Sequence, residues 1–245
     1  MADMGTFYIA AAMALVPTLL MMYILLRKYT YPHTERPYFS DPSFFWLFAV
    51  GLVAGTVMFL VYSYIMGNIV AVIVYALIQV LVPVAAMNLK RYRGKSDSVF
   101  YGLGFGLGAG GATAVGFIYY LATSVSILGD SLDIAGWAIL FVLAMSMLFQ
   151  YSAVGTTVGE GIARHDPMHF AVQAMIYNAV YWIVFSIMLM NTNSIVMYIM
   201  AVAVLAISVF YLWFAYTKEI AAIADEVDAM NDIPVGKRHR PKLNR

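Results

Sequence analysis

Long apolar runs separated by short polar segments divide the chain into seven parts. The runs cover roughly residues 6–26, 43–64, 69–89, 98–127, 136–163, 168–190 and 194–216. A helix rises about 1.5 Å per residue, so about 20 apolar residues cross a hydrocarbon core of about 30 Å. The pattern predicts an all-α polytopic membrane protein, with a seven-transmembrane-helix bundle over residues 1–217 and a tail over 218–245. No basic residue precedes the first run, so we expect a retained helix and no secretory signal.

Basic residues occupy only one side of this arrangement. With the N-terminus outside, all 14 Lys and Arg fall into the loops on the cytoplasmic side or into the tail. The opposite loops contain none, and one of them carries Asp130 and Asp133. Cytoplasmic loops of membrane proteins are enriched in Lys and Arg. We therefore predict a multi-pass protein of the cell membrane with its N-terminus outside and its C-terminus in the cytoplasm.

The tail has an amphipathic part and a basic part. An apolar stripe under an acidic face is formed by Ile220, Ile223, Ala224, Val227 and Met230. The basic residues at 237–242 are suited to anionic lipid, although a topology anchor in a solvated tail explains the same charges.

Composition agrees with a membrane protein and excludes several function classes. The 245 residues are 63% hydrophobic and 11% charged, whereas soluble domains carry about 25% charged residues. The lipid bilayer is therefore the first expected partner. A net charge of +1 offers no field for nucleic acid, so no nucleic-acid partner is expected. The absence of cysteine excludes thiolate catalysis and cysteine metal sites.

Glycines recur at every fourth position in the run over 98–127. Gly102, Gly106 and Gly110 share one face, and Gly104 and Gly108 repeat the spacing on another. Small residues at this spacing let helix backbones approach closely in a membrane, although each glycine costs helix propensity. The pattern predicts a central, tightly packed helix, either within the bundle or against a partner.

Charged groups are scarce within the runs. Glu160 and Arg164 lie four residues apart at the cytoplasmic end of the fifth run, which predicts an interfacial ion pair. His165 and His169 share this spacing, but a proline lies between them and no acidic third ligand is fixed at helical spacing, so we expect no metal. A retinal protein of this orientation needs a lysine at mid-depth of the last helix. Lys218 lies only at the end of that run, so this interpretation is rejected.

Three motifs follow one another along the chain. A Pro-rich basic loop leads into Ser43–Leu47, the third run contains Gln79, and the fourth run contains Gly102–Gly106. Together, over roughly residues 30–190, they resemble the superfamily of glutamic intramembrane proteases. That superfamily includes the PrsW and CAAX-prenyl protease families. It also includes a member without protease activity, the seven-helix scaffold subunit of γ-secretase (the anterior-pharynx-defective protein).

The resemblance implies where catalytic groups would lie, and the required residue types are missing there. The glutamates of the third and fourth helices correspond to Gln79 and Thr113, and the histidines of the fifth and sixth to Tyr151 and to Tyr177 or Asn178. Amides and hydroxyls form hydrogen bonds but do not take a proton from water at neutral pH. The resemblance thus implies a degenerate member with no catalytic residue and no cofactor. These five residues are expected to form a neutral remnant of the binding site inside the bundle.

The leading interpretation is a structural or assembly subunit of a membrane complex, with other membrane-protein subunits as partners. Two alternatives stay open. An intramembrane hydrolase with an atypical site would depend on Glu160, His165, Asp166 and His169. A small-molecule or lipid carrier would have a mid-membrane cavity lined by the remnant residues.

Overall fold

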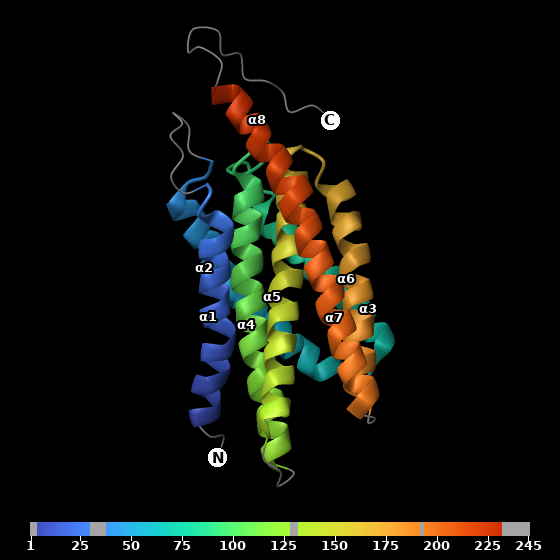
Figure 1. The fold of residues 1–245 in the computed structure, drawn as a ribbon. Coiled ribbons are helices and arrows are strands. Elements are labelled where there is room, and N and C mark those ends of the chain that lie inside the picture. The colour runs from blue at the N-terminus through green and yellow to red at the C-terminus, as the bar shows by residue number, and fades with distance from the viewer. Residues whose placement is uncertain (1–3, 30–37, 128–131, 192–193, 232–245) are drawn as a thin grey trace.

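The computed structural model describes residues 4–29, 38–127, 132–191 and 194–231. Every regular element in these ranges is a helix (Figure 1). In chain order they are α1 (Met4–Leu26), α2 (Asp41–Ile65), α3 (Ile69–Met87), α4 (Ser98–Ile127), α5 (Ile134–Ala163), α6 (Pro167–Met190), α7 (Ser194–Phe214), the π-helix η1 (Ala215–Ile220) and α8 (Ala221–Asn231). Seven spans among them are long and apolar enough to cross a membrane, so the predicted seven-helix membrane protein is confirmed at this level.

Local sequence signals explain where several helices begin. The side chain of Asn68 caps α3 by accepting hydrogen bonds from the backbone N–H groups of Val70 and Ala71, both at 3.1 Å. Gly67, with φ of 93°, lies just before this cap, and few other residues adopt that conformation without strain. Asp133 caps α5 by accepting from the N–H of Gly136 at 2.7 Å. Gly67 and Asn68 thus form the short turn between α2 and α3, and Asp133 determines where α5 begins.

The helices α4 and α5 form the centre of the bundle. They pack along each other, α1 and α2 pack on α4, and α6 and α7 pack on α5. The helix α3 packs mainly on α6 and also contacts α5. In Figure 1, α1 and α2 lie on one side of the α4–α5 pair, and α6, α7 and α3 lie on the other. This arrangement brings α3, α5 and α6 together around one interior region.

The glycine face of α4 is used inside the bundle. A Cβ added at Gly102 would strike the backbone carbonyl of Gly155, and one at Gly106 would strike that of Tyr151. At Gly110 the nearest atom, the Cα of Leu148, would lie 3.0 Å away. All three glycines therefore face α5, and the backbones of the two helices touch there.

A second contact, between α2 and α4, uses glycines from both helices. On α4, a Cβ at Gly108 would strike the carbonyl of Phe48. On α2, Gly51 and Gly55 likewise lie against the carbonyls of Phe105 and Ala109. The sequence pattern predicted the glycines of α4 but not their counterparts on α2.

The last membrane helix continues into the tail without a break. The helical chain runs through α7, η1 and α8, and no structural break marks the predicted boundary between 217 and 218 (Figure 1). The stripe residues Ile220, Ile223, Ala224 and Val227 are buried. Glu219, an acidic residue at the start of this segment, is also buried, with 3% of its surface exposed. Glu219 lies four residues from both Ala215 and Ile223, which are buried as well, so it shares their helix face. The basic residues at 237–242 lie outside the described residues.

Candidate functional site

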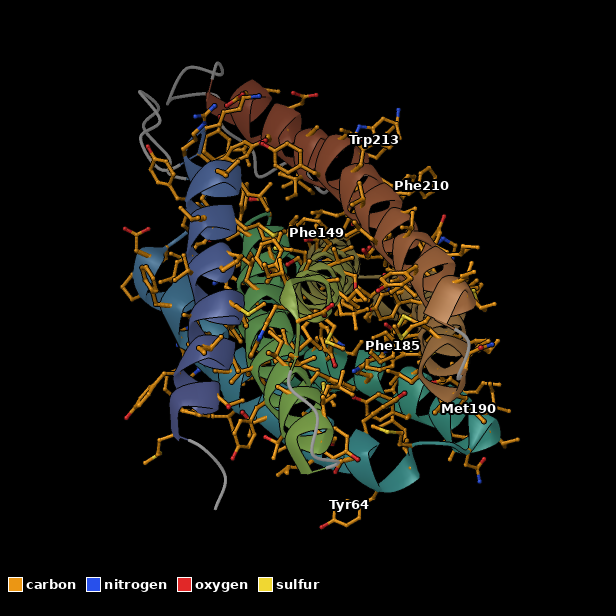
Figure 2. The ribbon with its side chains drawn as sticks, turned by 60° about the horizontal axis from the view of Figure 1, so that its bottom comes forward. Tyr64, Phe149, Phe185, Met190, Phe210 and Trp213 are labelled. Carbon is orange, nitrogen blue, oxygen red and sulfur yellow. The ribbon has the colours of Figure 1, made fainter. Side chains whose placement is uncertain are left out.

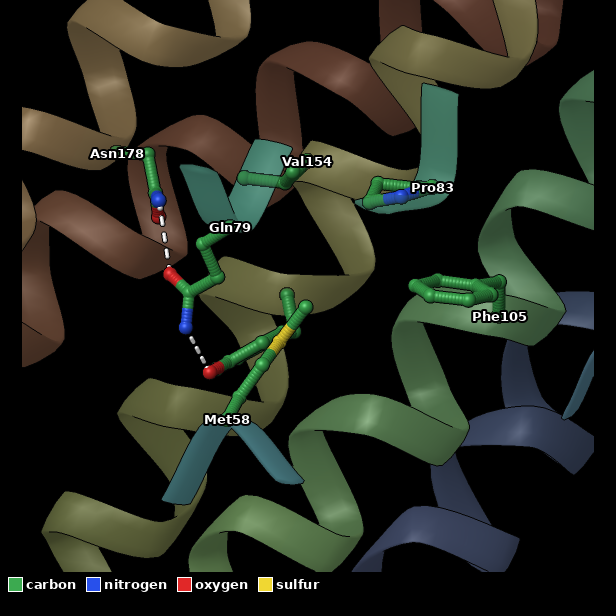
Figure 3. Close-up of a pocket in the computed structure, with 8 residues that line it drawn as sticks. Met58, Gln79, Pro83, Phe105, Val154 and Asn178 are labelled. Atoms are coloured by element: carbon green, nitrogen blue, oxygen red, sulfur yellow. Dashed lines mark hydrogen bonds between the residues drawn. The ribbon is translucent and has the colours of Figure 1, made fainter. Parts of the chain in front are cut away.

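Six neutral polar and aromatic side chains meet inside the bundle where α3, α5 and α6 converge. We call this group the polar cluster. It consists of Tyr75 and Gln79 from α3, Gln150 and Tyr151 from α5, and Asn178 and Trp182 from α6. All six side chains are buried. Figure 3 shows Gln79 at the centre, between Asn178 and α5.

The amide of Gln79 uses its full hydrogen-bonding capacity. Its Nε2 donates to the hydroxyl of Tyr75 at 2.9 Å and to the hydroxyl of Tyr151. Its Oε1 accepts from Asn178 Nδ2 at 2.8 Å and from Trp182 Nε1 at 2.6 Å. Two donors and two acceptor lone pairs are all that a glutamine amide offers. Gln79 therefore links three helices and has nothing left with which to bind a ligand.

The neighbours of Gln79 extend this network to the backbone. Asn178 Nδ2 also donates to the carbonyl of Ala76 at 2.8 Å, and Asn178 Oδ1 accepts from Gln150 Nε2 at 3.3 Å. The hydroxyl of Tyr75 donates to the carbonyl of Met58 on α2 at 3.0 Å. The network is incomplete at Gln150, because the buried Oε1 atom of this residue accepts no hydrogen bond from the described residues.

The structure brings together three of the five residues expected in the remnant site. Gln79, Tyr151 and Asn178 are hydrogen-bonded to one another through Gln79. Thr113 lies close to the Tyr151 hydroxyl, but its own hydroxyl donates to the carbonyl of Gly55 at 3.1 Å. Tyr177 lies apart and stacks on Tyr211 of α7 with 4.4 Å between ring centroids.

Sequence reasoning missed Tyr75, Gln150 and Trp182 as members of the cluster. Tyr75 precedes Gln79 by four residues, and Trp182 follows Asn178 by four, so each pair shares a helix face. That spacing was a usable signal for Tyr75 and Trp182. Gln150 lies next to Tyr151 in the chain, and its inward direction depends on how α5 packs.

A small cavity adjoins the polar cluster. Its volume is about 10 Å³, and Gln79, Tyr151 and Asn178 contribute to its wall (Figure 3). The rest of its lining is apolar apart from glycine, and includes Met58 and Phe105. Roughly 10–15 Å³ is the smallest space that holds one water molecule. The cavity has no room for a peptide, a lipid chain or a metabolite.

A second polar region lies at the end of the bundle where α5 meets η1 and α8. Arg164 Nε pairs with Glu160 Oε1 at 2.7 Å, at the spacing that the sequence indicated. Arg164 Nη1 also reaches Glu226 Oε1 of α8 at 3.3 Å. One guanidinium thus joins α5 to the tail helix.

Glu219 lies beside this pair but has a different environment. Both of its carboxyl oxygens are 2.9 Å from Thr157 Oγ1, which in turn accepts a hydrogen bond from the Tyr211 hydroxyl at 2.9 Å. No basic side chain pairs with Glu219 among the described residues. A hydroxyl has one hydrogen, so it serves one carboxyl oxygen at a time. The spacing of Tyr211, Ala215 and Glu219, each four residues apart, was the sequence signal for this buried face.

The tail helix is also joined to the segment before α2. The hydroxyl of Tyr38 donates to Asp228 Oδ1 at 2.5 Å. Burial, with this bond to a carboxylate as the next cause, raises the pKa of Tyr38 to about 12. The phenol therefore stays protonated, and the contact persists, throughout the physiological range.

The residues proposed for an atypical hydrolase do not form one site. His165, Asp166 and His169 are exposed, whereas Glu160 is buried and paired with Arg164. Within the described ranges, no hydrogen bond or ion pair joins the side chains of any two of these four residues. The same ranges contain no group of three or more His, Asp or Glu side chains placed to hold a metal ion.

No protein-family model, curated protein or solved structure matches this chain. The resemblance to the glutamic intramembrane proteases therefore stays a prediction.

Proposed function

We propose that this chain is a non-catalytic protein of the cell membrane that acts as a structural or assembly subunit of a membrane complex. The observation that carries the proposal is the polar cluster, which is neutral and whose central amide is fully bonded to its neighbours. Hydrogen bonds of this kind fix the register of α3, α5 and α6. We place the N-terminus outside and the C-terminus in the cytoplasm, on the one-sided distribution of basic residues.

Catalysis by the polar cluster is disfavoured by its chemistry. Hydrolysis needs a base that takes a proton from water, and donors aimed at a developing oxyanion. The cluster offers amide, phenol and indole groups, and the donors of Gln79 are directed at tyrosine oxygens. No carboxylate or imidazole lines the adjoining cavity among the described residues. A reaction at this place would require both a new base and the breaking of existing bonds.

A carrier function for the same region is disfavoured by space. A ligand site for a small molecule occupies about 300–1,000 Å³, whereas the cavity beside Gln79 measures about 10 Å³. The region around Gln79, where a carrier would hold its ligand, is therefore filled by side chains of the protein itself.

The outer surface of the bundle is suited to lipid and to other membrane helices. Figure 2 shows Phe210 and Trp213 of α7 pointing away from the bundle, while Phe185 of α6 points into it. Phe210 is 55% exposed and Trp213 57% exposed. Because the glycine faces of α4 are already occupied by α2 and α5, a partner subunit would pack on outer faces of this kind.

The non-catalytic part of the proposal is tested by reconstitution. The purified chain is placed in liposomes with membrane-spanning peptides, and cleavage is followed by mass spectrometry. We expect no cleavage above that in protein-free liposomes. Cleavage by the unmodified chain that disappears in the Tyr151→Phe variant would show that the cluster is an active site.

A further inference from the structure

A groove of about 370 Å³ opens between the end of α1 and the start of α2. Its volume lies within the range of about 300–1,000 Å³ that is typical of ligand sites. Apolar side chains form most of its wall, and one basic and one acidic residue also line it. The accessible apolar part of the wall includes Met22, Tyr23 and Phe45, and the charged part consists of Arg27 and Asp41.

The groove follows from how the first two helices pack. Both α1 and α2 lie on α4, but they make few contacts with each other. The glycines of α4 and α2 allow the backbones of these two helices to touch, whereas α1 packs on a different part of α4. The space left between α1 and α2 is therefore open toward the surrounding membrane.

The two charged residues of the groove are available to a ligand. Arg27 follows the last residue of α1, and Asp41 is the first residue of α2. Both are exposed, and neither side chain has a hydrogen bond or ion pair with another described residue. Although both line one groove, they do not pair with each other. A positive and a negative side chain thus lie where α1 ends and α2 begins, beside the apolar wall of the groove.

We propose that this groove binds one zwitterionic phospholipid whose headgroup carries a primary amine. An acyl chain lies along Met22, Tyr23 and Phe45, the phosphate binds Arg27, and the ammonium binds Asp41. Arginine forms strong charge-assisted hydrogen bonds with phosphate oxygens, and a carboxylate accepts them from an ammonium group. An anionic lipid without an amine would place its negative headgroup beside Asp41. A choline headgroup would present no N–H to it.

The proposal is tested by lipid titration of the full chain. Delipidated protein in mild detergent receives phosphatidylethanolamine, phosphatidylcholine or phosphatidylglycerol with identical acyl chains, and native mass spectrometry counts the bound lipids. We expect one phosphatidylethanolamine to bind about tenfold more tightly than either other lipid, because one charged hydrogen bond is worth about that factor.

Two variants separate the headgroup contacts. Arg27→Gln should weaken all three lipids, whereas Asp41→Asn should weaken phosphatidylethanolamine alone and abolish the preference for it. Lys28→Gln is the matched control for the first, because Lys28 is the next basic residue and does not line the groove. Asp166→Asn is the control for the second, because Asp166 is also exposed and precedes a proline at a helix start.

A Met22→Trp variant tests the apolar part by filling the groove, and it should exclude the lipid while the fold remains intact by circular dichroism. Equal binding of phosphatidylglycerol and phosphatidylethanolamine to the unmodified chain would overturn the proposal. So would unchanged binding in Arg27→Gln, or a lipid-free dimer in which a second copy protects the groove. None of these outcomes bears on the structural role proposed above.

Discussion

Gln79 forms hydrogen bonds with four neighbours through one amide, so its removal takes one hydrogen bond from each of four buried groups. In Gln79→Leu the amide of Asn178, the indole N–H of Trp182 and two phenols each lose a hydrogen bond. One buried unsatisfied group costs about 1–3 kcal/mol, although hydrogen bonds between membrane helices average only about 0.6 kcal/mol. We expect a loss of about 1–3 kcal/mol, measured by unfolding in detergent.

Gln150→Leu is the matched control for this prediction, because Gln150 donates a single bond of 3.3 Å and its Oε1 already lacks a partner. Its expected loss is below about 1 kcal/mol. Equal losses in the two variants would mean that the polar cluster does not depend on Gln79.

Two buried glutamates, Glu219 and Glu160, should respond differently to replacement by glutamine. Glu160 has a cation, Arg164, whereas Glu219 has only the hydroxyl of Thr157. An ionised group that is buried without a cation costs free energy, so Glu219→Gln, which keeps the shape and removes the charge, should leave the stability unchanged or raise it. Glu160→Gln should lower the stability by about 1 kcal/mol, since it removes a partly buried ion pair. Thermal unfolding at neutral pH distinguishes them, and the reverse order would contradict this account.

The residues of the polar cluster were only partly predictable. Gln79, Tyr151 and Asn178 were identified through the family resemblance, which aligned them with expected catalytic positions. Gln150 was not placed in the cluster, because one sequence says nothing about which side of α5 faces α6. Glu219 was not predicted as a buried group, although its spacing of four residues from Ala215 and eight from Tyr211 puts all three on one helix face.

Among the elements, the seven apolar runs correspond closely to α1 through α7 because a membrane enforces both their length and their composition. Helix packing was less predictable. The glycine repeat of α4 indicated close contacts, but it did not say with which helix. Gly51 and Gly55 of α2 formed too short a pattern to stand out, although they lie against the α4 backbone.

Alanine substitutions at Gly106 and Gly110 test how closely α4 and α5 pack. A Cβ at Gly106 would strike the backbone of α5, which cannot move without separating the helices. At Gly110 the nearest atom would be 3.0 Å away, so a shift of a few tenths of an ångström would suffice. Gly106→Ala should therefore cost about 1–3 kcal/mol through overpacking, and Gly110→Ala distinctly less. Equal unfolding temperatures for both variants would show that the α4–α5 contact is looser than described.

At the scale of the whole molecule, orientation in the membrane is a prediction that labelling can decide. The chain has no cysteine, so single substitutions report without background. In intact cells a membrane-impermeant maleimide should label Ser131→Cys, in the acidic loop, because that loop carries no basic residue. It should label Ser96→Cys, in the basic loop, only after permeabilisation. The opposite pattern would invert the proposed topology.

The role proposed for this bundle is to support the assembly of a membrane complex without carrying out a reaction of its own. The most direct test is the native mass of the particle that contains this chain after extraction from its own membrane in mild detergent. We predict a mass above that of the 27.1 kDa chain with its lipids, and release of a different membrane protein in a fixed ratio on dissociation. A particle that contains only this chain and lipid would contradict it.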